Sequence, residues 1–166
     1  VLSDGKYWGL DIDLDGTKLL VAGYHRDLWT DGTLQDLTSI FVLEADPPTS
    51  SKSWRLTPNV ISDIDVVAGY TDPVQIEYGE EDGHILYQSM RNDTTGKERL
   101  GLWYAHGDIE QSSWTYKKAV GDYASLAQMK VETIDGEDRL VVAWKEGSGI
   151  ESRLITKIVD DSFSII

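Results

Sequence analysis

Apolar and polar residues alternate along several short stretches of this sequence. In residues 8–15 the apolar side chains Leu10, Ile12 and Leu14 alternate with three aspartates. A period of two predicts a β-strand with one buried and one solvated face, because successive side chains of a strand point to opposite sides. We therefore expect the apolar residues of this strand to face a core and the aspartates to face outward.

Asp-Gly pairs separate the predicted strands, and Asp-Gly is a strong signal for a hairpin turn. No segment keeps a 3.6-residue period, so we expect little helix. The pairs are Asp15-Gly16, Asp82-Gly83 and Asp135-Gly136. The predicted strands cover residues 8–15, 18–24, 40–45 and 53–56, then 74–78, 85–90, 100–105 and 113–116, and finally a run that reaches the third Asp-Gly pair, residues 140–144, and a strand after residues 147–149.

The order of strands and turns repeats along the chain. Moving residues 42–54 by sixty positions superimposes them on residues 102–114 without a gap and aligns Trp54 with Trp114. The second and third Asp-Gly pairs are 53 positions apart, and the first and second are 67 apart. Units of this size predict about three four-stranded, blade-like repeats in a single all-β domain. The approximate units are residues 7–56, 68–116 and 124–166.

The repeat favours a β-propeller, with a β-sandwich as the alternative that short strands also allow. Known propellers usually have four to eight blades, so three blades would leave sheet edges open. A second copy of the chain, or another chain, would then complete the ring. Residues 162–166 resemble one further strand, which could complete the first blade of this chain or of a neighbour.

Composition excludes several classes of function. The 166 residues suffice for one domain with a sizeable core, and the net charge of −14 would repel nucleic acid and anionic membranes. We expect no membrane insertion, because no apolar run is long enough for a transmembrane helix, and a signal peptide that is absent or already removed. Zero cysteines exclude disulfides and leave the compartment open, with a secreted or extracellular location favoured.

Three aspartates, Asp11, Asp13 and Asp15, stand before Gly16 as in a calcium-binding loop. Calcium prefers oxygen ligands at alternate positions with a turn-forming glycine. The twelfth position, however, holds Ala22 and not the glutamate that such loops use. Outward-facing carboxylates of a strand explain the pattern better, so we expect no metal and no cofactor.

Catalytic motifs are few. His25, His84 and His106 could serve in a Ser-His-Asp triad, but there is no G-x-S-x-G motif, and we expect each histidine on the surface or in a turn. Glycoside hydrolysis needs two carboxylates across a cleft, and among 29 acidic residues no particular pair stands out. A sialidase-type aspartate box is only mimicked by residues 3–8, whose spacing is too short.

Aromatic residues supply the best candidate binding site. The six tryptophans and eight tyrosines could pack on the apolar faces of sugar rings while Arg and Glu bind hydroxyl groups. In the third unit Arg139 opens a strand, Trp144 closes it and Glu151 begins the next strand. The alternative is that the tryptophans pack between blades, and the repeat makes Trp54 and Trp114 the stronger candidates for that structural role.

Residues 138–142 (Asp-Arg-Leu-Val-Val) and 149–151 (Gly-Ile-Glu) resemble a repeat of the fungal fucose-specific lectins, which are propellers with sugar sites between blades. Residues 9–23 resemble generic propeller repeats, which imply no ligand. The lectin resemblance covers about thirty residues. It implies that Arg139 and Glu151 bind sugar hydroxyls, with Trp144 or Trp114 stacking on the ring.

Three functions follow as hypotheses. The main one is a lectin-like carbohydrate-binding module without catalysis. The alternatives are a protein-interaction scaffold and a fragment of a propeller-type glycoside hydrolase, because fold alone does not fix function. The expected partner is a glycan or a protein, and the chain is expected to be a homo-oligomer or part of a larger propeller. The site residues of the main hypothesis are Arg139, Glu151, Trp144 and Trp114.

Overall fold

Eleven β-strands and one short 3-10 helix make up the secondary structure of the part of the chain that the computed structural model describes. No helix in this part is long and apolar enough to cross a membrane. The described residues are 5–15, 18–27, 38–45, 54–65, 72–80, 82–92, 98–111, 114–122, 124–147 and 149–166.

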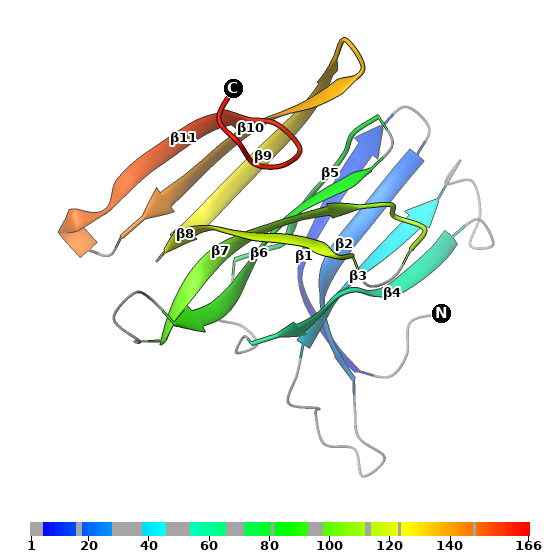
Figure 1. The fold of residues 1–166 in the computed structure, drawn as a ribbon. Helices are drawn as coiled ribbons and strands as arrows, with labels where there is room; N and C mark the ends of the chain where they lie inside the picture. The colour runs from blue at the N-terminus through cyan, green and yellow to red at the C-terminus, as the bar shows by residue number, and fades with distance from the viewer. Residues whose placement is uncertain are drawn as a thin grey trace.

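The strands form three antiparallel sheets, each with its strands in chain order (Figure 1). The first sheet comprises β1 (Gly5–Asp15), β2 (Lys18–Asp27), β3 (Thr38–Ala45) and β4 (Trp54–Ile64). The second comprises β5 (Gln75–Tyr78), β6 (Gly83–Asn92), β7 (Glu98–Gly107) and β8 (Tyr116–Asp122). The third comprises β9 (Ala124–Ile134), β10 (Glu137–Glu146) and β11 (Arg153–Val159), with the helix η1 (Gly149–Glu151) between the last two.

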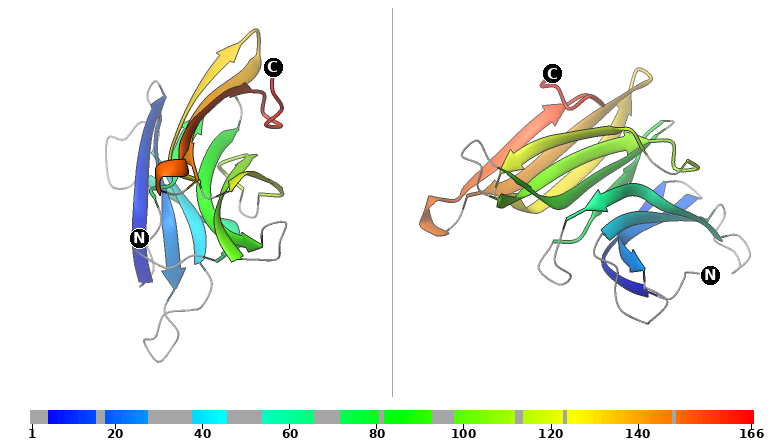
Figure 2. Two further views of the ribbon diagram at one scale, coloured as in Figure 1. Left: turned by 90° about the vertical axis from the view of Figure 1, so that its left-hand side faces the viewer. Right: turned by 60° about the horizontal axis from the view of Figure 1, so that its bottom comes forward.

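The second sheet lies between the other two, as the right-hand view in Figure 2 shows, and its two faces contribute to two separate cores. Strand β5 contacts β1 of the first sheet and β9 of the third. The first strands of the three sheets therefore lie next to one another, as the inner strands of propeller blades do. This arrangement confirms the predicted all-β, propeller-type fold with blade-like repeats, and it is not the two-layer packing of a β-sandwich.

The third sheet differs from the prediction because it has three strands and not four. After β11 the chain turns, and Ile165 pairs with Val159 of β11 in an isolated antiparallel bridge. The backbone N–H of Ile166 also donates to the Ile158 carbonyl. Residues 162–166 therefore begin to extend the third sheet, and the prediction that they could complete the first blade of this chain is wrong.

Two apolar cores fill the spaces between the sheets. One lies between the first and second sheets and includes Leu20, Ala22, Ile76 and Ile85. The other lies between the second and third sheets and is built mainly from Leu86, Leu102, Tyr104, Met129, Val131, Leu140, Val142, Trp144 and Val159. Each sheet is thus held to the next by packing of one face on another.

The two Asp-Gly pairs within the described residues lie where the first two strands of a sheet connect, but in different registers. Asp135 and Gly136 have φ angles of 55° and 77° and form a two-residue turn between the paired residues Ile134 and Glu137. Such positive angles are what a type I′ hairpin turn requires, and glycine adopts them at little cost. In the second sheet, by contrast, Gly83 is already the first residue of β6.

The predicted equivalence of Trp54 and Trp114 is wrong. Trp54 is the first residue of β4, pairs with Ala45 and is 38% exposed. Trp114 precedes β8, is 4% exposed and packs in the core between the first and second sheets. The residue that pairs with Ala105, which aligns with Ala45, is Lys117. Strand β7 continues two residues beyond Ala105, to Gly107, so Ala105 and its partner Lys117 are 12 positions apart whereas Ala45 and Trp54 are 9 apart, and alignment by sequence fails after β3 and β7.

The faces of β1 are also reversed relative to the prediction. Leu10, Ile12 and Leu14 are more than half exposed. Asp11 and Asp13 instead face the second sheet, where their Oδ2 atoms accept hydrogen bonds from backbone N–H groups of β5. Alternation correctly predicted a strand here, but it could not tell which of the two faces a neighbouring sheet would cover.

Candidate functional site

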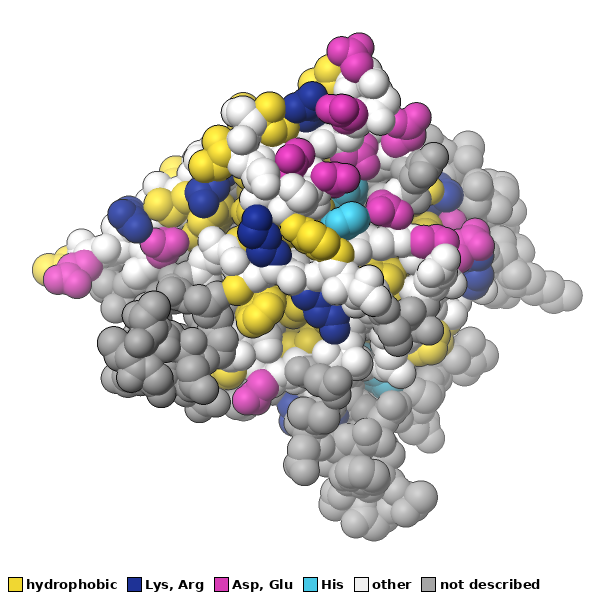
Figure 3. All heavy atoms as spheres, viewed as in Figure 1, with side chains coloured by type: hydrophobic (Ala, Val, Ile, Leu, Met, Phe, Trp, Pro, Cys, Tyr) yellow, Lys and Arg dark blue, Asp and Glu magenta, His cyan; other side chains and the backbone are white. Residues whose placement is uncertain are grey.

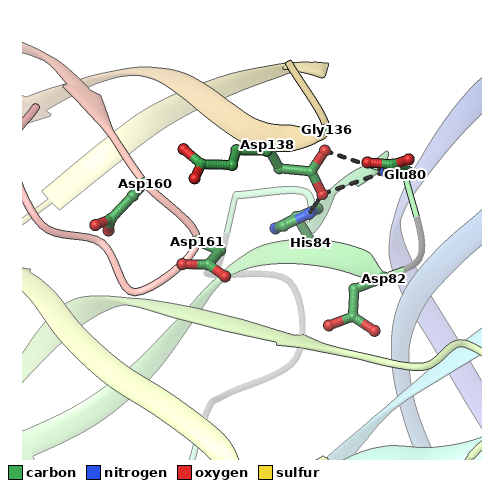
Figure 4. Close-up of a pocket in the computed structure, with 8 residues that line it drawn as sticks. Glu80, Asp82, His84, Gly136, Asp138, Asp160 and Asp161 are labelled. Carbon is green, nitrogen blue, oxygen red and sulfur yellow. Dashed lines mark hydrogen bonds and ion pairs between the residues drawn. The ribbon is translucent and has the colours of Figure 1, made fainter. Parts of the chain in front are cut away.

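A pocket of about 570 Å³ lies where the hairpin ends of the second and third sheets meet (Figure 4). Its volume falls within the range of small-molecule sites. The lining comes from the loop after β5, the start of β6, the β9–β10 hairpin and the turn after β11. The lining residues are Glu80, Asp82, His84, Gly136, Glu137, Asp138, Asp160 and Asp161.

Asp138 is the best-anchored carboxylate of the pocket. Its Oδ1 accepts hydrogen bonds from Thr133 Oγ1, at 2.7 Å, and from the Glu80 backbone N–H, at 3.1 Å. Thr133 is the cross-strand partner of Asp138, so the tight hairpin itself places donor and acceptor together. Burial alone would raise the pKa of Asp138, but the hydrogen bonds from Thr133, His84 and Glu80 outweigh it and lower that pKa. The group is therefore an anion at neutral pH.

His84 links the second sheet to this carboxylate. Its side chain is fully buried, and its Nε2 lies 3.0 Å from Asp138 Oδ2. Burial lowers the pKa of His84, and the neighbouring Asp138 opposes that shift only in part. The imidazole is therefore neutral at physiological pH, and its burial contradicts the prediction of a surface or turn position. His25 is buried as well.

Tyr104 fixes the tautomer of His84. The Tyr104 hydroxyl lies 2.7 Å from His84 Nδ1, and burial raises the pKa of Tyr104, so its O–H is retained and can donate. Nδ1 must then accept, and Nε2 carries the proton that it donates to Asp138. The result is a hydrogen-bonded chain from Tyr104 through His84 to a carboxylate at the pocket wall.

A row of polar side chains crosses the second sheet beside this chain. Glu77, His84, His106 and Tyr116 are direct cross-strand partners on β5 to β8. His106 Nδ1 lies 3.0 Å from Asp82 Oδ2, and the rings of His84 and His106 are stacked with centroids 6.0 Å apart. The face of the second sheet that meets the third is thus apolar at its centre and ionisable at its hairpin end.

Gly79 allows the sheets to approach at this point. A Cβ atom at this position would lie 1.9 Å from Asp138 Oδ2 and 2.7 Å from His84 Nε2. Any larger residue would therefore displace the Asp138 carboxylate from His84. The glycine at the end of β5 is required by close packing at the site.

The rim opposite Asp138 is formed by the turn after β11. Asp160 Oδ1 accepts hydrogen bonds from Ser162 Oγ, at 2.7 Å, and from the Ser164 backbone N–H, at 2.8 Å. The hydrogen bonds from Ser164 and Ser162 lower the pKa of Asp160. Tyr116 of the second sheet donates to the Ser162 carbonyl, so the turn is tied to the same polar row.

The electrostatic character of the pocket is strongly negative. Six carboxylates and no Lys or Arg occur among its described lining residues. Figure 3 shows acidic side chains gathered around the histidine atoms in the upper part of the view. No three His, Cys, Asp or Glu side chains within the described ranges are close enough together to hold a metal ion.

The sequence-predicted residues Arg139 and Glu151 are not brought together. Arg139 lies near the hairpin end of β10 and pairs with Glu137 at 2.9 Å, whereas Glu151 is an exposed residue of η1 beyond the other end of β10. At about 3.4 Å per residue, the part of β10 between them spans roughly 24 Å. The structure therefore places these two residues toward opposite ends of β10.

Trp144 and Trp114 are packing residues in different cores. Trp144 is buried between the second and third sheets, and its Nε1 donates to Glu146 Oε2 at 3.3 Å. Trp114 is buried between the first and second sheets, with its Nε1 donating to the Asp108 carbonyl at 2.9 Å. The four predicted sugar-binding residues therefore do not line one site, although Arg139 adjoins the pocket through Glu137.

The weak calcium candidate is used differently in the structure. Asp11 and Asp13 accept hydrogen bonds from the Ile76 and Tyr78 backbone N–H groups, at 2.9 and 3.0 Å. These carboxylates thus accept hydrogen bonds from N–H groups at the edge of β5 and link the first sheet to the second. The expectation that they face outward is therefore wrong. The Asp15 side chain and Gly16 lie outside the described residues.

Sequence reasoning missed the pocket because its residues come from distant segments. His84 and Asp138 are 54 positions apart and no local motif connects them. The Asp-Gly repeat was the available signal, because two of the three Asp-Gly pairs lie at the hairpin ends that form the pocket. If the acidic residues in and next to these turns had been compared as well, Asp82 and Asp138 would have been candidate site residues.

Comparison with known protein families and with curated proteins finds no match. Among solved structures, the chain is similar to the α-L-arabinanase of Cellvibrio cellulosa, with 11% identity and a TM-score of 0.32 over 95% of this chain and 74% of that one. The same enzyme complexed with arabinohexaose gives 10% identity and a TM-score of 0.30 over 93% and 73%. Similarity at this level assigns no activity, and the resemblance to fungal fucose-specific lectins stays a prediction.

Proposed function

We propose that this chain is a carbohydrate-binding module of the β-propeller type and that the acidic pocket is its sugar site. The observation that supports this proposal is a pocket of about 570 Å³ lined by six carboxylates. Sugar hydroxyl groups donate hydrogen bonds, and ionised carboxylates only accept them. Asp138 has a fixed orientation because three donors hold it, so its accepting geometry is set before a ligand arrives.

The charge of the pocket narrows the class of sugar. Its described lining includes no cationic side chain that could offset a carboxylate on the ligand. Like charges in a partly enclosed site repel more strongly than in bulk water. The proposed ligand is therefore a neutral or basic glycan, and sialylated or uronic-acid glycans are expected to bind poorly.

The test is a glycan array followed by titration of a bound glycan against matched variants. Asp82→Asn and Asp161→Asn each remove one accepting charge at the pocket rim and should weaken binding about ten-fold or more, because a hydrogen bond to a charged group contributes roughly 1.5–3 kcal/mol. Glu151→Gln is the control, since Glu151 lies on η1, away from the pocket. Loss of binding in the control but not in the rim variants would contradict the proposal.

Glycoside hydrolysis is the second candidate. Burial and the nearby Asp13 raise the pKa of Glu77, only partly opposed by Lys130, whereas the pKa of Asp138 is lowered. Carboxyl groups whose pKa values are moved apart are what an acid and a nucleophile or base require. Glu77 is the cross-strand partner of His84, which binds Asp138, but it forms an ion pair with Lys130 and is not among the residues that line the pocket.

Hydrolysis is tested with chromogenic glycosides and neutral polysaccharides, including arabinan. Product release that is lost in Glu77→Gln and in Asp138→Asn would support this candidate. Glycan binding without any product release would contradict it and support the non-catalytic module.

A further inference from the structure

One face of the first sheet is apolar and open. Leu10, Ile12 and Leu14 of β1 are 54%, 63% and 63% exposed on the side away from the second sheet. Half-buried apolar partners on β2, β3 and β4 extend this surface, namely Leu19, Val21, Leu43 and Leu56. We call these seven residues the open face of the first sheet. A contiguous apolar surface of this kind marks an interaction site.

The central residues of the open face occupy positions whose equivalents in the third sheet are buried. The first hairpins of the first and third sheets end in the pairs Asp15–Lys18 and Ile134–Glu137. Counted from these pairs, Ile12, Val21 and Leu43 correspond to Val131, Leu140 and Val159. The latter three are 6%, 0% and 0% exposed because the second sheet covers them. The open face is therefore built to be covered by a preceding sheet.

The third sheet has a matching uncovered face. Val141 and Ile158 are cross-strand partners and are 44% and 54% exposed. By the same count they correspond to Ala22 and Val42, which are buried where the first sheet meets the second. This face is therefore built to be covered by a following sheet.

A carboxylate at each sheet boundary repeats the same pattern. Asp13 of β1 accepts from the Tyr78 N–H of β5, and Glu77 of β5 accepts from the backbone of Val131 in β9. Counted from the hairpin, Glu132 of β9 occupies the position of Asp13 and is exposed. The third sheet thus carries an acceptor for the open backbone edge of a further inner strand.

We propose that a second copy of this chain covers both faces. The uncovered face of the third sheet in each copy packs on the open face of the first sheet in the other, as the first sheet packs on the second. The same kind of sheet-on-sheet contact already occurs twice within one chain, between the first and second sheets and between the second and third. Each chain carries both surfaces that such a contact needs, so a two-fold arrangement of two chains covers both open faces at once. The ring would have 3 + 3 = 6 sheets, within the range of known propellers.

The first test is the mass in solution by light scattering or sedimentation. The chain mass is 18.6 kDa, so two copies give 2 × 18.6 = 37.2 kDa. Ile12→Glu and Val141→Glu place a charge in the proposed interface and should give the monomer mass with an unchanged β-type circular dichroism spectrum. Ile150→Glu is the matched control, because Ile150 is fully exposed on η1 and belongs to neither face.

The second test does not depend on disruptive substitutions. The chain has no cysteine, so Lys6→Cys and Glu151→Cys, at exposed positions outside both faces, can be labelled separately with donor and acceptor fluorophores and mixed. Energy transfer is expected on mixing. A monomeric wild-type protein, an open-ended assembly, a dimer that both glutamate variants leave intact, or a dimer without energy transfer would each overturn the proposal.

Discussion

His84 Nε2 lies 3.0 Å from Asp138 Oδ2, and this contact joins the second sheet to the third. The imidazole is fully buried and neutral, whereas the carboxylate is ionised. The hydrogen-bonded chain from Tyr104 through His84 to Asp138 therefore stays intact only while His84 Nδ1 carries no proton and Asp138 is ionised. Acidification adds a proton to each of these two groups and so weakens the contact chain at both places.

Stability should fall on mild acidification. The folded-state pKa of His84 is below its unfolded value of about 6.5, so between the two values the unfolded chain binds more protons. The free energy of unfolding is therefore complete above pH 6.5 and decreases as the pH falls toward the folded pKa, by up to about 1.4 kcal/mol per pH unit. Urea unfolding at a series of pH values should show this slope, and His84→Gln should reduce it. An unchanged slope in that variant would contradict the assignment.

Gly79→Ala should separate the same two groups. The added methyl group would meet Asp138 Oδ2 at 1.9 Å, so the carboxylate must move away from His84. Since Asp138 holds the pKa of His84 up against the effect of burial, its displacement should lower that pKa further, as measured by NMR titration. Gly136→Ala is the control, because its nearest neighbour is 3.5 Å away. That change should cost about 1 kcal/mol through its φ angle of 77° without moving the His84 titration.

Trp114→Ala and Trp54→Ala should differ sharply, although the sequence aligns the two residues. Trp114 is 4% exposed and its loss leaves a cavity between two sheets, so we expect a cost of about 3–5 kcal/mol. Trp54 is 38% exposed at the start of β4 and should cost no more than about 1 kcal/mol. Thermal or urea denaturation of the two variants measures the difference. Equal costs would restore the equivalence that the sequence repeat implied.

Strands and hairpin turns could be predicted from the sequence because their causes are local. Asp135-Gly136 supplies the positive φ angles of a two-residue turn whatever surrounds it. The buried face of β1 could not be predicted, because its apolar and acidic faces are equally regular. The second sheet decides between them by offering Asp11 and Asp13 the unpaired N–H groups of β5.

Most of the candidate site could not be predicted either, because contacts between sheets decide which residues form it. Arg139 belongs to the expected motif and Trp144 follows it closely in the sequence, but strand alternation buries Trp144 and leaves Arg139 beside Glu137. Asp138 becomes a site residue only because His84 and Glu80, from another sheet, donate to it. Contacts between sheets leave no fixed spacing in a sequence.

Asp13 should stabilise the fold as a hydrogen-bond acceptor and not through its charge. Its Oδ2 accepts from the Tyr78 N–H at 3.0 Å, and its side chain is only 11% exposed. Asp13→Ala leaves that buried N–H without its acceptor and should cost about 1–3 kcal/mol in urea unfolding, whereas Asp13→Asn keeps an oxygen and should cost less. Both variants remove a negative charge that raises the pKa of Glu77, so NMR titration should show that pKa lowered in each. If Asp13→Asn were as destabilising as Asp13→Ala, the ion pair with Lys130, at 4.0 Å, and not the backbone contact would be the main link between these strands.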